Sequence, residues 1–175
     1  MKYFYGCKRF TISPKVVLRR FELDGESTLG WGLSLSSSRS FGKGHKLFAT
    51  MLYGDGIGRY AGLGMNGGAG LTNSGDIETV EFKSLRVGAQ FSLSENILWS
   101  IGAGYGEQDK DDYEGSDAVL TGFATKDAFS WRTHIIWKAT PKMEYAVGIV
   151  SSDMEVMDGR DGDMIRLQSY FKYSF

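Results

Sequence analysis

A period-two alternation of apolar and polar residues, sustained over stretches of ten or more residues from residue 15 onward, constrains this chain most strongly. Successive side chains of a strand point to opposite faces, so this alternation is typical of β-strands with one apolar and one polar face. In the clearest stretch, Phe129, Trp131, Ile135 and Trp137 alternate with polar neighbours such as Arg132. We predict an all-β protein with eight strands, at residues 15–24, 27–40, 46–54, 77–93, 96–107, 119–139, 143–155 and 163–175.

The predicted connections differ in length in a regular way. Those at 41–45, 94–95 and 140–142 are tight turns, whereas those at 55–76, 108–118 and 156–162 are longer and rich in glycine or acid. Strands of about 9–11 residues or more, with short turns at one end and long loops at the other, are typical of an antiparallel up-and-down transmembrane β-barrel. A soluble β-barrel with its apolar residues inside would show the same alternation of apolar and polar residues and would bind a hydrophobic ligand. This fold is the alternative.

The amino-terminal residues 1–14 are basic and lack the apolar core and cleavage site of a secretory signal. We treat residues 1–14 as a separate basic segment, which could be the remnant of a truncation. Residues 15–175 form one predicted β-barrel domain. The single cysteine, Cys7, excludes an internal disulfide framework.

The carboxyl end resembles the assembly signal of bacterial outer-membrane barrels. Gln168, Tyr170, Tyr173 and the terminal Phe175 lie in a closing strand with an aromatic last residue. Tyr170 stands where that signal prefers glycine. The resemblance implies recognition by the barrel-assembly machinery.

Two further motifs resemble the DcaP-like family of outer-membrane porins. They are Gly30-Trp31-Gly32-Leu33 and, after a turn, Tyr53-Gly54-Asp55-Gly56-Ile57-Gly58-Arg59-Tyr60. The resemblance covers most of residues 15–175 and implies a sixteen-stranded, trimeric porin for small organic anions such as dicarboxylates. The chain would then be the carboxy-terminal half of such a barrel, because only about eight strands are predicted.

A complete small eight-stranded barrel, acting as a non-conducting anchor or an adhesion or structural protein, is the alternative. The residues predicted on the polar face favour the larger barrel, because many of them are glycines and serines, including Gly30, Gly32, Gly102 and Gly104. Such small residues would underfill an eight-stranded lumen, which side chains normally fill.

Basic residues provide the candidate functional site. On the predicted inward parity we place Arg20, Arg86, Arg132, Lys138 and Arg166, with Lys172, and we place Arg59 on a loop that could narrow the pore. Rings of charge set the selectivity of pores, and arginine suits carboxylates through its bidentate fork. The simpler alternative is that these side chains form wall salt bridges with acids such as Glu22 and Glu144.

Two segments are strongly acidic: residues 107–117 carry a net charge of −5 and residues 153–163 a net charge of −4. They are either solvated loops or weak sites for divalent cations that bridge lipopolysaccharide phosphates. The carboxylates concerned are Asp109, Asp111, Asp112, Asp158, Asp161 and Asp163.

We find no catalytic motif and expect neither enzymatic activity nor a cofactor nor nucleic-acid binding. The expected location is the bacterial outer membrane. The expected partners are its lipid and lipopolysaccharide, the assembly machinery, small anionic solutes and two further copies in a homotrimer.

Overall fold

The computed structural model describes residues 5–7, 10–42, 44–60, 62–63, 65, 68–72, 75–109 and 124–175. These contain β1 (Tyr5–Cys7), β2 (Phe10–Leu23), β3 (Glu26–Phe41), β4 (His45–Asp55), the 3₁₀ helix η1 (Gly58–Tyr60), β5 (Ala69–Leu71), β6 (Ile77–Thr79), β7 (Glu81–Ser92), β8 (Ile97–Gln108), β9 (Thr125–Thr140), β10 (Met143–Val156) and β11 (Asp161–Tyr173).

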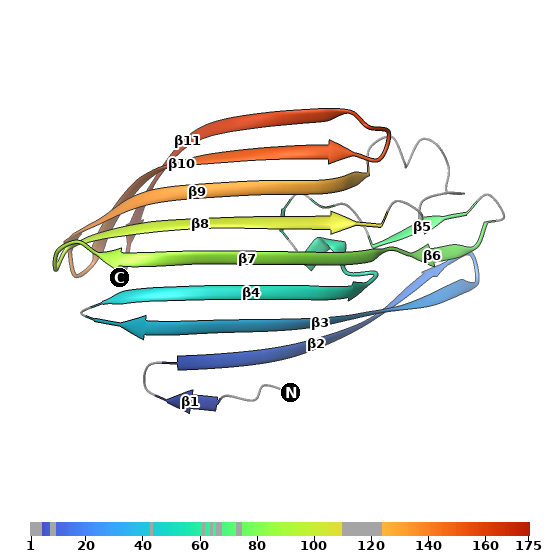
Figure 1. Ribbon diagram of the computed structural model, residues 1–175, viewed down its shortest axis with the longest axis horizontal. Coiled ribbons are helices and arrows are strands. Elements are labelled where there is room, and N and C mark those ends of the chain that lie inside the picture. Colours follow the sequence, from blue (N-terminus) through green and yellow to red (C-terminus); the bar gives the residue numbers. More distant parts are fainter. Residues whose placement is uncertain are drawn as a thin grey trace.

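Nine of the strands form one antiparallel sheet in the order β1-β2-β3-β4-β7-β8-β9-β10-β11 (Figure 1). Apart from the inserted β5–β6 hairpin, neighbours in the chain are neighbours in space, which is the up-and-down arrangement that the sequence predicts. The sheet is curved and open in the described part of the chain, with β1 and β11 at its two edges.

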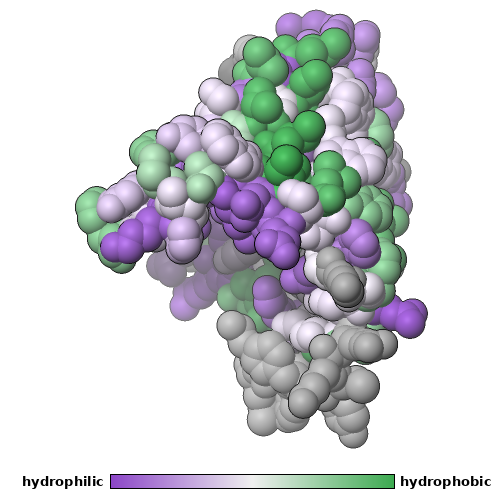
Figure 2. Space-filling model, turned by 90° about the vertical axis from the view of Figure 1, so that its left-hand side faces the viewer, coloured by the Kyte–Doolittle hydropathy of each residue, from purple (hydrophilic) through white to green (hydrophobic). Residues whose placement is uncertain are grey.

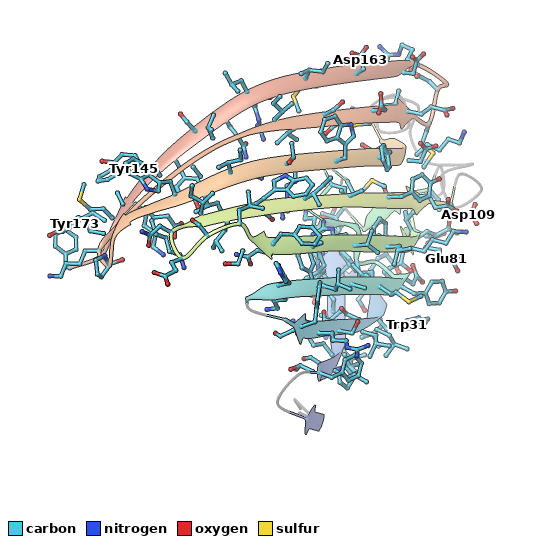
Figure 3. All side chains as sticks on the ribbon, turned by 60° about the vertical axis from the view of Figure 1, so that its left-hand side comes forward. Trp31, Glu81, Asp109, Tyr145, Asp163 and Tyr173 are labelled. Carbon is cyan, nitrogen blue, oxygen red and sulfur yellow. The ribbon has the colours of Figure 1, made fainter. Side chains whose placement is uncertain are left out.

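The connections segregate as the sequence predicts. The turns around 42–44, 93–96 and 141–142 lie at one end of the strands, which we call the turn end. The connections after β4, β8 and β10 leave the strands at the other, the loop end, where the tight turn at Asp24–Gly25 also lies. Figure 3 shows Tyr145 and Tyr173 at the turn end and Glu81, Asp109 and Asp163 at the loop end.

The strands present one apolar and one polar face. On the apolar side, which we call the outer face, large hydrophobic residues are exposed: Leu18 is 75% exposed and Leu167 is 74% exposed. Figure 2 views the sheet along its strands and shows hydrophobic residues gathered on the surface toward the top, where the last strands lie. An apolar face left exposed is the reverse of a soluble barrel with an apolar interior, so the structure does not support that alternative.

Aromatic side chains mark both borders of the outer apolar face. At the turn end Trp137 stacks on Tyr145 at 5.7 Å between ring centroids, and Tyr145 contacts Phe171 at 4.9 Å. At the loop end Trp31 and Tyr53 meet edge to face at 5.7 Å. Two aromatic belts separated by an apolar band are typical of barrels that cross a membrane.

The opposite, inner face is lined by small and polar residues and is partly covered by the chain itself. After β4 the chain turns onto this face, and η1 lies behind the sheet in Figure 1. Ile57 is fully buried there, in a cluster with Met65, Phe82 and Ala128. The largest apolar core of the described residues therefore lies between the sheet and this connection.

The predicted strands agree with the observed ones to within a few residues, with two differences. β2 begins at Phe10, within the segment assigned to 1–14, and it contains Pro14, which is tolerated there because the edge strand β1 pairs with β2 only at residues 10–12. The predicted strand 77–93 is divided between β6 and β7. The prediction for 119–123 lies outside the described residues.

Candidate functional site

The basic residues of the inner face converge on one groove. Arg86 of β7, Arg132 of β9 and Arg166 of β11 line a cavity of about 630 Å³ that crosses the last five strands. Apolar side chains, Phe48 among them, form much of the remaining wall, and Asp153 and Asp163 contribute to it as well.

Strand register explains why these three arginines share a groove. Arg132 pairs with Val150, which pairs with Arg166, so the two arginines occupy the same row two strands apart. Strands lie about 4.8 Å apart, so their Cα atoms are roughly 10 Å apart. Arg86 pairs with Gly104 in the adjacent row. The glycine leaves room for its side chain, since a Cβ on Gly104 would lie 3.0 Å from Cγ of Arg86.

These guanidinium groups are not neutralised by the described part of the chain. No described carboxylate lies within 4.0 Å of Arg86, Arg132 or Arg166, although such pairs occur elsewhere, for example Arg160 with Asp158. Nη2 of Arg86 is buried without a hydrogen-bond partner among the described residues. A desolvated donor of this kind is costly unless a ligand or water satisfies it.

The register places Arg20 on the other side of the sheet and corrects its assignment to the inner face. Arg20 pairs with Leu29 on the outer parity that also carries Leu18, and it forms an exposed ion pair with Glu22 at 3.3 Å. The inward residue is Arg19, whose guanidinium lies 4.4 Å from the centre of the Phe21 ring.

The other predicted basic residues lie apart from the groove. Arg59 is exposed on η1, within the connection that covers the inner face. Lys138 lines a separate cavity of about 470 Å³ at the turn end, together with Lys142, Glu144 and Lys172. The structure thus divides the predicted series of basic residues into a groove of three arginines and a group of lysines.

The proposed assembly residues at the carboxyl end make polar and aromatic contacts with their neighbours. The side-chain amide nitrogen of Gln168 lies 2.6 Å from Nε2 of His134 on the inner face. Tyr170 donates a hydrogen bond to Glu144 at 2.7 Å. Tyr173 contacts Phe175 edge to face at 5.2 Å.

The acidic residues form no group of three or more potential metal ligands within the described ranges. Asp158 accepts hydrogen bonds from the Arg160 side chain at 2.8 Å and from its backbone at 3.1 Å. These bonds hold the pKa of the Asp158 carboxyl below its usual value. In the register of β10 and β11, Asp161 lies opposite Glu155 and Asp163 lies opposite Asp153. Asp111 and Asp112 lie outside the described residues.

Sequence reasoning missed the residues that the connection after β4 contributes to this face. Tyr60 lines a second cavity of about 270 Å³ beside Arg86, and Leu63 lines the arginine groove. The glycine-rich sequence around them was the available signal, because glycine permits close backbone approach.

Comparisons with known proteins address the fold. The solved structure of the outer membrane channel DcaP of Acinetobacter baumannii superposes with a TM-score of 0.82, at 21% sequence identity. The alignment covers 99% of this chain and 49% of that channel. The chain has the fold of an outer-membrane channel.

The DcaP likeness confirms, at the level of fold, the resemblance seen in the sequence motifs, and the chain spans about half the length of that channel. No family model matches the chain. No curated protein matches it in sequence. Within the described residues, no helix is long and apolar enough to cross a membrane.

Proposed function

We propose that this chain forms wall strands of a porin in the bacterial outer membrane, through which small anionic organic solutes diffuse passively. The observation that carries the proposal is the groove in which Arg86, Arg132 and Arg166 converge without described acidic partners. The likeness to the DcaP channel supports the conducting role, which involves no catalytic step.

The proposed mechanism is electrostatic. A narrow, water-filled passage with positively charged walls raises the local concentration of anions and lowers that of cations. Arg132 and Arg166 share a register row, so a carboxylate can pass from one guanidinium fork to the next. Binding has to stay weak for the solute to leave, which is why several sites in sequence serve diffusion better than one tight site.

Charge reversal in the groove tests this proposal. We expect Arg86→Glu combined with Arg132→Glu to lower the anion-to-cation permeability ratio, measured from reversal potentials in a salt gradient across a planar bilayer. Two reversed charges roughly 10 Å from the ion path, partly screened by salt, should change the ratio about threefold.

The matched control is Arg20→Glu combined with Arg39→Glu, which changes the net charge equally. Both residues lie on the outer parity and are exposed. We expect this variant to keep the original ratio. Equal effects of the two double variants would show that overall charge, and not the groove, governs selectivity.

Several partners belong to the same proposal. The exposed aromatic and apolar residues of the outer face suit contact with membrane lipid, and the acidic loop end suits cation-bridged lipopolysaccharide. The aromatic residues Tyr173, at the end of β11, and Phe175, which follows it, would be recognised by the barrel-assembly machinery. A homotrimeric porin is the assembly that the family resemblance implies.

A further inference from the structure

The turn end of the last three strands carries a second group of cations. We call Lys138 of β9, Lys142 of the turn that follows β9, and Lys172 of β11 the lysine group. All three side chains are exposed, and they line the cavity at this end of the strands together with Asn96 and Ser174.

Strand register shows where the lysine group lies. Lys138 and Lys172 both lie opposite Glu144 of β10, so these three residues form one row across β9, β10 and β11. The row is on the inner face, because the adjacent residues Trp137 and Tyr145 belong to the aromatic belt of the outer face. The lysine group therefore lies at the mouth of the lumen, at the end where outer-membrane barrels have their short periplasmic turns.

The lysine group is separate from the arginine groove. Lys138 follows Arg132 by six residues on β9, and Lys172 follows Arg166 by six residues on β11. A strand rises about 3.3 Å per residue, so the two sets of cations are roughly 20 Å apart along the strands. A small solute in the groove does not reach the lysines, which makes them a second site.

Glu144 stands between two lysines in the row but pairs with neither. Among the described residues, no carboxylate lies within 4.0 Å of an ammonium group of the lysine group. Oε1 of Glu144 instead accepts a hydrogen bond from the hydroxyl of Tyr170 at 2.7 Å. Tyr170 stands where the assembly signal prefers glycine. Glycine has no hydroxyl to donate, so this departure from the signal provides the partner of Glu144.

The cavity has the chemistry of an anion site. Its lining carries three lysines and one glutamate, a net charge of +2. An ammonium group is a point charge with three donors on a flexible stem, so it contacts carboxylates without requiring one fixed geometry. The Cα atoms of Lys138 and Lys172 are two strands, or roughly 10 Å, apart. This spacing suits a small anion that carries two or more separated carboxylates.

We propose that the lysine group is a second anion site, which binds small polycarboxylates at the turn-end mouth of the lumen, and that Tyr170 keeps this site open by holding Glu144 away from the lysines. Tyr170 is a positioning residue in this scheme, since it acts through Glu144. Release of solute through this site rests on the proposed channel function, whereas the anion site and the role of Tyr170 do not.

Lysine acetylation measured by mass spectrometry tests the site without relying on conduction. In the full chain refolded in detergent, saturating citrate should slow acetylation of Lys138 and Lys172 at least about threefold, because bound ligand withholds the amines from the reagent. Lys46 is the internal control, since it is exposed at the same end of the sheet and does not line this cavity. Equal slowing at all three lysines, or slowing at none, would overturn the site.

Removal of the Tyr170 hydroxyl tests the positioning role. Tyr170→Phe frees Glu144 to pair with a lysine, so the citrate concentration for half protection should rise roughly fivefold, the effect of one exposed ion pair. Tyr145→Phe is the matched control, because it removes a hydroxyl on the neighbouring strand from the outer face. We expect the control to keep the original concentration, and equal effects of the two variants would overturn the role of Tyr170.

Glu144→Gln separates this charge effect from a merely structural one. It removes a negative charge from the cavity, so the concentration for half protection should fall roughly threefold, and Tyr170→Phe should then have no further effect. A similar rise on adding Tyr170→Phe in both backgrounds would overturn positioning through Glu144. Where Tyr170→Phe fails to fold, an unchanged concentration in Glu144→Gln would overturn it as well.

Planar-bilayer recording links the site to the proposed channel. Citrate added at the turn end should reduce the chloride current at a concentration at least about threefold lower than citrate added at the loop end, and Lys138→Gln with Lys172→Gln should abolish this difference. An anion-selective current without the difference would overturn the site's role in release and leave the channel. Absence of current with the acetylation pattern intact would overturn the proposed function and leave the anion site.

Discussion

At the scale of single residues, the difference between Arg19 and Arg20 shows where local pattern stops being informative. Val16, Val17 and Leu18 are all apolar, so alternation does not determine which parity of β2 faces inward. The pairing of Arg19 with Gly30 and of Arg20 with Leu29 decides it. Only the partner strand carries that information, because a shift of one residue exchanges the faces.

The turn between β10 and β11 allows a pH prediction. The pKa of Asp158 is lowered by Arg160, so the pair stabilises the folded turn above the carboxyl's ordinary pKa and loses that contribution as pH falls through the lowered value. We expect Arg160→Ala to return the Asp158 pKa toward its ordinary value of about 4. An NMR titration of the carboxyl carbon measures this, and an unchanged pKa would remove Arg160 as the cause.

At the scale of elements, the two faces of β8 give a prediction about the membrane. Ile101 lies on the apolar outer face beside Thr133, and its neighbour Ser100 lies on the inner face opposite His134. Ile101→Arg should lower the free energy of unfolding in lipid vesicles by about 2–4 kcal/mol, the cost of a cation on the lipid side near mid-membrane.

Ser100→Arg is the matched control, since it adds the same charge one residue away on the opposite face. We expect a much smaller loss in the same denaturant titration, because lumen positions tolerate charge. A larger loss of unfolding free energy for Ser100→Arg than for Ile101→Arg would show that the inner face, and not the outer face, contacts lipid.

Among the connections, the one after β4 departs most from expectation. The sequence analysis treats residues 55–76 as an ordinary long loop with Arg59 as a possible constriction charge. The structure turns the connection onto the inner face, where Ile57 is buried and Arg59 stays exposed. The glycines that permit this packing were visible in both motifs, but their contacts lie across strands and could not be derived from spacing.

At the scale of the whole molecule, the open sheet leaves hydrogen-bonding edges. β1 pairs with β2 only at residues 10–12, and β11 pairs with β10 alone among the described strands. Unpaired edges in a membrane or in water favour association with another strand. Whether β2 and β11 pair with each other is therefore the central question about assembly.

Gel migration of the chain refolded in detergent addresses this question. The small residues of the inner face underfill a closed eight-stranded barrel, so we expect no compact, heat-modifiable monomer. We expect species larger than a monomer, detected by cross-linking before denaturation. A compact monomer band that shifts on boiling would instead show that β2 and β11 close an eight-stranded barrel.

The sequence by itself determined the strands, the membrane-type faces and the division into turn and loop ends, because alternation and turn composition are local properties of the backbone. Tertiary structure alone decided which arginines meet, since Arg86, Arg132 and Arg166 are joined by register across five strands. It also decided that a glycine-rich connection packs inward, since that depends on contacts between residues such as Gly30 and Gly56 that lie 26 positions apart.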